Sequence, residues 1–446
     1  MGNQLLVRLY NVDVGDCIYV RLPNGNEDFH ILIDCGSLGV KSILKSALEH
    51  LEQELPVDAA TGKKRLDLLV ATHIHEDHIK GFDPEYFKNI QINHIWLSAV
   101  MDPAHPQAEH TMRLHNFASQ KIRELAVSGL ALTPELESLM ALYSITNDGA
   151  LDALRVDLPR ANHILPKYVH AGRSSNDPDL NLGLNNQTTI HVLAPEKDID
   201  HFYLGQAASN LQGFTAFSNR VRAEAAPAAV SAPANISASD FRLLQTRMLS
   251  NLLAFADLDG ATQNNMSVVL LIEWRKRRLL FVGDAEWDNA FKDGTRNSSW
   301  NVMWNKRQAQ LNSPIDFLKI GHHGSINATP WSSANDAEFE PNKILDAILP
   351  LPQAGSKPSA KAIVSTIRKN YPTIPAANLL VEIGKRVGNT QKYKSKLEEA
   401  GKNPNVLNLF AEFEAVMLDE LQPTRTDIEK ILTGQDFVEV TIDPAD

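Results

Sequence analysis

The sequence predicts a layered sandwich of the α/β or α+β class, and three observations lead to this prediction. Short runs rich in β-branched and aromatic residues open the chain, a segment with helical periodicity follows them, and apolar strands then resume. Strand, helix and strand in this order are typical of sheets packed against helices. With 446 residues, 43% of them hydrophobic and 22% charged, the chain has the composition of a folded, water-soluble protein with a large core.

The first third is expected to hold most of one sheet. Strands are predicted at 5–11, 17–22 and 29–34, with a turn signal at 23–26 between the second and the third. Apolar residues at helical spacing predict a helix over 42–55. Strands at 66–71 and 94–98 follow.

Two stretches are expected to be helical insertions, at about 101–165 and 198–260. The first predicts helices over 119–128 and 134–143; the second contains a Pro/Ala/Ser-rich segment, 223–237, expected to be a mobile loop, and helix-forming residues 240–257. Strands are predicted at 188–193, 267–274, 278–282 and 315–320. We expect residues 1–354 to form one domain and 355–446 a mostly helical extension. Its last strand, 437–442, either rejoins the sandwich or pairs with another subunit.

Charge and cysteine content restrict the class of protein. The net charge of −11 gives no support to a general nucleic-acid coat protein, although it does not exclude a local basic channel. Cys17 and Cys35 are too few for a disulfide framework and are expected to be buried thiols. No apolar run approaches the roughly 18 residues that span a bilayer, and no signal peptide is expected. These features predict a cytoplasmic location.

Three histidines and a carboxylate fall within six residues, at His73, His75, Asp77 and His78, directly after the predicted strand 66–71. Residues i and i+2 of an extended segment project to the same side, and a tight loop can return the last two side chains to the same point. Neutral imidazole and carboxylate are ligands of zinc, manganese and iron. The pattern therefore favours a metal site over a solvated, histidine-rich strand end.

Two further apolar strands end in potential ligands. Asp284 follows residues 279–283, where a carboxylate could bridge two cations, and His322 and His323 follow residues 317–321. Each segment alone is compatible with an ordinary turn. Together with the first motif, they place candidate ligands at the ends of three strands, which we expect to meet along one edge of the sheets.

These segments resemble the metallo-β-lactamase superfamily of metallohydrolases. The resemblance lies in THIHEDH at 72–78, FVGDA at 281–285 and LKIGHHGS at 318–325, and it covers about residues 4–100 and 165–330. The opening NVDVGDCIYVRLPNG…ILIDCG and the segment NNMSVVLLIEWRKRRLLFVGD are similar to one branch, the hydrolase domains of competence (ComEC-type) DNA-uptake proteins. The resemblance implies an α+β fold, an αββα sandwich with a dinuclear metal site along the shared edge of two sheets.

The resemblance also implies two divalent cations, zinc or alternatively manganese. The implied ligands are His73, His75, Asp77, His78, Asp284 and one of His322 and His323. The H-x-H pair would hold one metal, the adjacent Asp-His pair the other, and Asp284 would bridge them. His322 is slightly preferred over His323 for closing the second site. Asp34, at the end of its strand, is expected to orient a ligand.

One departure from the superfamily pattern concerns a further histidine that many members carry before the strand leading to Gly-Asp. Here that segment, 261–267, contains no histidine. The competence-type branch has a similar Asn-rich segment, so we expect one metal with fewer protein ligands rather than an inactive enzyme. His163, His170 and His191 could substitute, although a structural role is expected for each.

The expected reaction is metal-assisted hydrolysis, with Asp77 and Asp284 as the catalytic residues. The sequence contains no G-x-S-x-G elbow that would supply a serine nucleophile. A phosphodiester, in nucleic acid or in a small nucleotide or phosphoester, is the preferred substrate. The basis is partly the resemblance and partly the basic residues of 355–400 and of the hairpin tip 275–278.

Two other functions stay open. One is hydrolysis of a carboxylic ester, lactone or thioester, with a β-lactam the least favoured substrate. The other is a scaffold or regulatory module with a structural metal, in which the insertions 101–165 and 198–260 dock protein partners. The sequence does not decide the oligomeric state.

Overall fold

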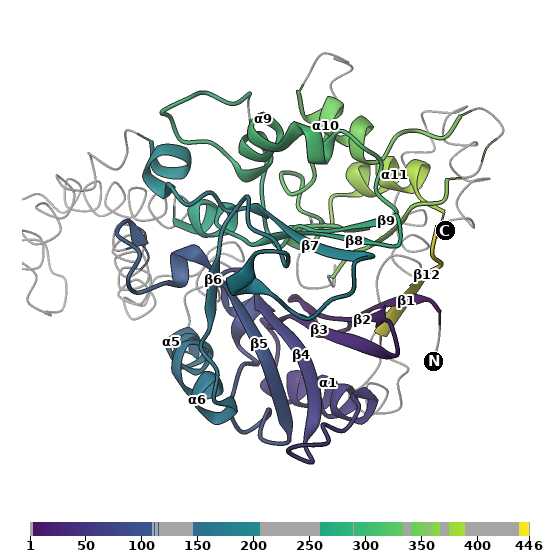
Figure 1. Ribbon diagram of the computed structural model, residues 1–446. Helices are drawn as coiled ribbons and strands as arrows, with labels where there is room; N and C mark the ends of the chain where they lie inside the picture. Colours follow the sequence, from purple (N-terminus) through teal and green to yellow (C-terminus); the bar gives the residue numbers. More distant parts are fainter. Residues whose placement is uncertain are drawn as a thin grey trace, which may run out of the picture.

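The computed structural model describes residues 3–108, 111, 115, 146–205, 259–288, 290–332, 340–353, 356, 358–365, 374–388 and 437–445. Within these residues, two β-sheets lie face to face, and helices cover the outer face of each (Figure 1). The predicted α+β class is confirmed. The predicted helices 119–128, 134–143 and 240–257, and the predicted loop 223–237, lie outside the described residues.

The first sheet is mixed and has seven strands. They are β1 Leu5–Tyr10, β2 Cys17–Asn24, β3 Glu27–Cys35, β4 Lys64–Ala71, β5 Ile90–Ser98, β6 Lys167–Val169 and β12 Phe437–Ile442. Their order is β12-β1-β2-β3-β4-β5-β6, antiparallel from β12 to β3 and parallel from β3 to β6. The last predicted strand therefore rejoins the sandwich, where Leu5 lies opposite Ile442.

The second sheet has five strands: β7 Thr188–Ala194, β8 Val269–Trp274, β9 Arg277–Phe281, β10 Phe317–Lys319 and β11 Lys361–Ile363. Their order is β11-β10-β9-β8-β7, with β9, β10 and β11 parallel. Arg275 and Lys276, both with positive φ, form the two-residue turn of the predicted hairpin. Both β11 and β12 pair with strands that precede residue 354; the division at 354 stays a prediction.

Helices lie on the two outer faces (Figure 1). On the side of the first sheet they are α1 Lys41–Glu54, α5 Thr146–Asp152 and α6 Leu158–Asn162, with the π-helical turn η2 Ala153–Asp157 between the last two. On the side of the second sheet they are α9 Ser299–Leu311, α10 Glu340–Ile348 and α11 Ala377–Arg386. Short turns complete the described helices: α2 Glu76–Ile79, η1 Ala99–Met101, η3 Pro178–Leu180, η4 Asp200–Leu204 and η5 His322–Gly324. None of the described helices has the length and apolarity needed to cross a bilayer.

Three hydrophobic clusters fill the spaces between these layers, because side chains of a strand alternate between its two faces. In β4, Leu68 and Val70 point into the core between the sheets, whereas Leu69 and Ala71 join the core under α1. The remaining cluster lies between the second sheet and α9, α10 and α11. Cys17 and Cys35, predicted to be buried thiols, are buried and unbridged.

The fold brings the ends of parallel strands from both sheets together. A backbone hydrogen bond connects the two halves at this edge, since Val268 N donates to Thr72 O over 2.9 Å. Within the second half, His322 N donates to Gly283 O over 3.2 Å and so ties the end of β10 to the end of β9. The loop before β2 is fixed to the same place, since Asp16 N donates to Asp77 O over 2.9 Å. The carboxyl ends of strands in layered α/β folds are the usual position of functional side chains.

Candidate metal centre

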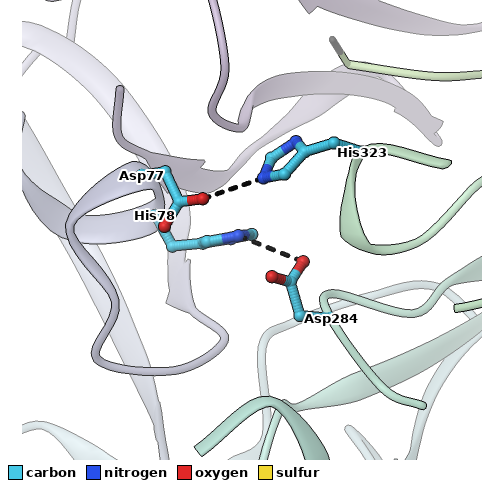
Figure 2. A group of neighbouring side chains, drawn as sticks. All are labelled: Asp77, His78, Asp284 and His323. Atoms are coloured by element: carbon cyan, nitrogen blue, oxygen red, sulfur yellow. Dashed lines mark hydrogen bonds and ion pairs between the residues drawn. The ribbon is translucent and has the colours of Figure 1, made fainter. Parts of the chain in front are cut away.

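The candidate ligands meet where β3 and β4 of one sheet and β9 and β10 of the other come to an end. His73, His75, Asp77 and His78 follow β4, Asp284 follows β9, and the adjacent histidines follow β10. Figure 2 shows Asp77 and His78 approaching from one half of the sandwich and Asp284 and His323 from the other. The sequence prediction that three strand ends converge is therefore what the fold produces.

The first cluster consists of His73, His75 and Asp284, whose candidate ligand atoms all lie within 4.8 Å of one another. His73 Nε2 is 3.1 Å from His75 Nδ1 and 3.6 Å from Asp284 Oδ2. All three residues are buried. The extended backbone at this strand end places residues 73 and 75 on the same side, as their spacing predicts.

The second cluster consists of Asp77, His78, Asp284 and His323, again with candidate ligand atoms within 4.8 Å of one another. His323 Nε2 lies 2.9 Å from Asp77 Oδ2, and His78 Nε2 lies 3.1 Å from Asp284 Oδ1 (Figure 2). Asp284 belongs to both clusters. Its two oxygens face different neighbours, which is the arrangement that a bridging carboxylate requires.

Buried atoms without hydrogen-bond partners show whether these residues fit a cation. Among the described residues, His75 Nε2 and Asp77 Oδ1 are buried and make no hydrogen bond, and the buried His78 Nε2 and Asp284 Oδ1 make none apart from their mutual ion-pair contact of 3.1 Å. Leaving such atoms unpaired costs about 1–3 kcal/mol each, so native proteins rarely keep several together without a reason. Imidazole nitrogens and carboxylate oxygens that converge in this way suit divalent cations. The residues therefore fit a metal centre.

Asp34 holds His78 in place, as the sequence analysis expected. Its carboxylate accepts hydrogen bonds of 2.7 Å from both the backbone N–H and the hydroxyl of Thr72, and Oδ2 lies 2.8 Å from His78 Nδ1. A carboxylate at Nδ1 fixes the tautomer in which Nε2 carries the free lone pair. That lone pair points into the second cluster.

A buried polar network fixes the His323 ring of the second cluster, and the sequence analysis missed it. Lys319 Nζ donates to Asp16 Oδ2 over 2.9 Å, and Ser365 Oγ donates to the other oxygen of Asp16. The Ser365 carbonyl accepts from His323 Nδ1 over 2.7 Å, which leaves Nε2 of that ring facing Asp77. A lysine inside the otherwise apolar strand β10 was the one signal that could have pointed to this network.

Glu286 and its asparagine partners were also missed. Asn264 Nδ2 donates to Glu286 Oε1 over 2.9 Å, and Asn265 Nδ2 donates to Oε2 over 3.3 Å. Glu286 is buried, and Oε1 lies 3.6 Å from His322 Nδ1. The Asn-rich segment, where the sequence analysis found no histidine, therefore positions a carboxylate beside the site.

Burial sets the protonation of the imidazoles in the first cluster. Loss of water contact lowers the pKa of His73 well below its usual range and that of His75 to about 4. Both rings are neutral at neutral pH and can offer lone pairs to a cation.

The second cluster balances charge instead. Burial alone would raise the pKa of the Asp77 and Asp284 carboxyls, but the neighbouring histidines outweigh it and lower both. Burial alone would lower the pKa of His78, but Asp284 and other nearby carboxylates outweigh it and raise that pKa. A divalent cation can replace the protons that compensate these carboxylates, which couples metal binding to proton release.

The adjacent histidines take different positions. His323 is in the second cluster, whereas His322 Nε2 lies 3.8 Å from Asp284 Oδ2, and its side chain is 24% exposed. The geometry thus favours His323 for closing the second site, opposite to the slight preference drawn from the sequence. Which of the two binds metal stays a prediction.

The other histidines considered from the sequence lie in unrelated contacts. His191 pairs with Glu273 at 3.3 Å, His170 Nδ1 contacts the carbonyl of Ala171, and His163 ends α6 in a left-handed conformation. Among the described residues, none of these three belongs to a metal-type cluster.

Comparisons with known proteins agree with this geometry. The family model described as the metallo-beta-lactamase superfamily matches residues 10–122, a segment that contains Asp34 and the motif from His73 to His78. No curated protein matches the chain. The matched segment is similar to that superfamily, and the buried His/Asp clusters that the fold builds around it are consistent with the divalent-metal binding typical of the superfamily.

Proposed function

We propose that the chain hydrolyses phosphodiester bonds with the help of two divalent cations. The observation that carries this proposal is the pair of buried ligand clusters that share Asp284. Two divalent cations held by these residues would polarise the scissile group and lower the pKa of the attacking water toward neutrality.

The protein's own residues supply ligand atoms on two sides of Asp284. His73 and His75, neutral because they are buried, supply lone pairs on one side of Asp284. Asp77 and His78 do so on the other side, with His78 held by Asp34. Fixed ligands of this kind need little reorganisation during the reaction.

Asp77 suits the role of ligand better than that of proton acceptor. Its oxygen Oδ2 accepts from His323, and Oδ1 has no partner among the described residues. The neighbouring histidines lower the pKa of this carboxyl, which makes it a weak base. We therefore assign Asp77 and Asp284 to holding cations and positioning the reacting water.

The choice of a phosphodiester rests on the resemblance of the opening strands and of the segment 264–284 to competence-type hydrolase domains. Most of the described basic residues add nothing to it, because they have other partners. Arg277 pairs with Asp316 at 2.7 Å, and Arg386 pairs with Glu382 and Asp346 at 2.7 Å each. The rest of the basic segment 355–400 lies largely outside the described residues.

The proposal is tested by hydrolysis of bis(p-nitrophenyl) phosphate by protein loaded with Zn²⁺ or with Mn²⁺. The Asp77→Ala variant is expected to lose turnover, whereas Asp157→Ala, which removes an aspartate that lies away from the clusters and pairs with Arg160 at 3.5 Å, keeps it. Turnover that survives in Asp77→Ala would overturn the proposal. Turnover of p-nitrophenyl acetate or a thioester but of no phosphodiester would favour the carboxylic-ester alternative.

A further inference from the structure

The two clusters offer unequal numbers of ligands. The second cluster has four candidate residues, and the first has three, counting Asp284 in both. Zinc in proteins is almost always bound by at least three protein ligands, with a fourth position filled by another side chain or by water. The first cluster therefore has room for one more side chain.

The orientation of Asp284 indicates which side chain is nearest to that position. Its Oδ1 is 3.1 Å from His78 Nε2 and so faces the second cluster. Its Oδ2 is 3.6 Å from His73 Nε2 and 3.8 Å from His322 Nε2. His322 thus lies on the same side of the shared carboxylate as the first cluster.

The backbone explains how adjacent histidines reach different cations. His322 and His323 both have positive φ, 41° and 53°, a left-handed conformation that L residues rarely adopt. The turn aims His323 at Asp77 and leaves His322 facing Asp284 and Glu286. Such a conformation costs about 1–3 kcal/mol per residue and persists where the surroundings enforce it.

Glu286 is positioned to orient His322. Its Oε1 lies 3.6 Å from His322 Nδ1, an atom that is buried and makes no hydrogen bond among the described residues. Asn264 and Asn265 hold the carboxylate in place. A carboxylate on one ring nitrogen leaves the other, Nε2, to face a cation beside Asp284 Oδ2.

We propose that His322 completes the first cluster when a cation binds there, so that the adjacent histidines serve different cations, and that Glu286 is its positioning residue. His322 now lies just outside the first cluster, whose ligand atoms are within 4.8 Å of one another. Its side chain is 24% exposed and is therefore not fully enclosed by its neighbours. This inference rests on the two-cation site of the proposed function.

The test counts cations and measures their affinity by calorimetric titration of metal-free protein with Zn²⁺. Wild type is expected to bind two equivalents. His322→Ala should weaken one of them by more than about 100-fold and leave the other unchanged. Glu286→Gln should weaken the same equivalent by about 10–100-fold. His191→Ala, which removes a histidine paired with Glu273 outside the site, is the matched control.

Double variants identify which cation is affected. Combined with His73→Ala, which removes a ligand of the first cluster, the loss of His322 should still leave the other cation bound with wild-type affinity, because both changes act on one cation. Combined with His323→Ala, it should leave neither cation tightly bound. His322→Gln, with circular dichroism of every variant, replaces His322→Ala if that variant fails to fold.

Two outcomes overturn the inference: wild-type affinity for both equivalents in His322→Ala, or weakened binding of both cations when His322→Ala is combined with His73→Ala. A wild type that binds fewer than two cations overturns the inference and the proposed function together. A chain that shows the expected pattern and yet hydrolyses no phosphodiester keeps the inference and refutes only the proposed function.

Discussion

Replacing Gly36 with alanine is expected to disrupt the second cluster while leaving the sheets in place. Gly36 follows β3 and lies against the backbone of the metal-binding loop. A Cβ at this position would be 2.1 Å from both Asp77 C and His78 N, whereas ordinary van der Waals contact begins at 3.4 Å. These are backbone atoms, so no side-chain rotation can relieve the overlap.

The size of the effect follows from those distances. Either the loop or residue 36 must move by about 1 Å, and the loop carries Asp77 and His78 of the second cluster. A misplacement of about 1 Å can reduce the rate of a positioned reaction by about 100-fold. Overpacking adds a destabilisation of about 1–3 kcal/mol. We therefore expect activity and affinity for one cation to fall much further than stability.

The assay combines Zn²⁺ titration, phosphodiester turnover and thermal unfolding of Gly36→Ala. Gly149→Ala is the control, because a Cβ on this exposed glycine of α5 meets nothing within 4 Å. This control should keep wild-type Zn²⁺ affinity and turnover, and it should gain up to about 1 kcal/mol of helix stability. Wild-type cation affinity and turnover in Gly36→Ala, with the fold intact, would refute the reasoning.

Three further predictions concern charge. Asp284→Asn should weaken both cations, because Asp284 is common to the two clusters, whereas His73→Ala should weaken one; equal effects in a calorimetric titration would contradict this. Lys319→Met should lower the free energy of unfolding by about 3–5 kcal/mol in urea, since it leaves the buried Asp16 without its cation, and a loss below about 1 kcal/mol would count against the pair. Burial lowers the pKa of His30 to about 4, below the unfolded value near 6.5, so the folded state binds fewer protons between those values and stability is lost as the pH falls from 6.5 toward 4. His30→Asn should remove up to about 3 kcal/mol of that pH dependence in urea titrations, and an unchanged profile would show that His30 is not its source.

Local pattern was enough to predict the strands and the first motif. Alternating or continuous apolar runs predicted β1 to β4 within two or three residues, because each lies between two other strands and has a largely buried run of side chains. The spacing of the residues from His73 to His78 was enough to predict that His73 and His75 lie on the same side, since i and i+2 share a face at a strand end. Strands β6 and β11, with three residues each, are too short to produce a pattern.

Contacts between distant segments were beyond sequence reasoning. Asp16, Lys319 and Ser365 form one network although Asp16 is 303 residues from Lys319 and 349 from Ser365, and no periodicity links such positions. The positions of His322 and His323 depend on a turn in which both have positive φ, which the residue types do not suggest. Glu286 was overlooked because its partners, Asn264 and Asn265, approach it through the fold of the second sheet.

The most direct test of the central claim measures bound cations and turnover in the same samples. Metal-free protein is dialysed against increasing Zn²⁺ or Mn²⁺, the cations per chain are counted, and hydrolysis of bis(p-nitrophenyl) phosphate is followed in each sample. We expect two cations per chain. Turnover should rise as the shared site around Asp284 fills, and it should disappear on chelation. Turnover by protein that holds no metal, or two bound cations with no hydrolysis of any ester, would contradict the central claim.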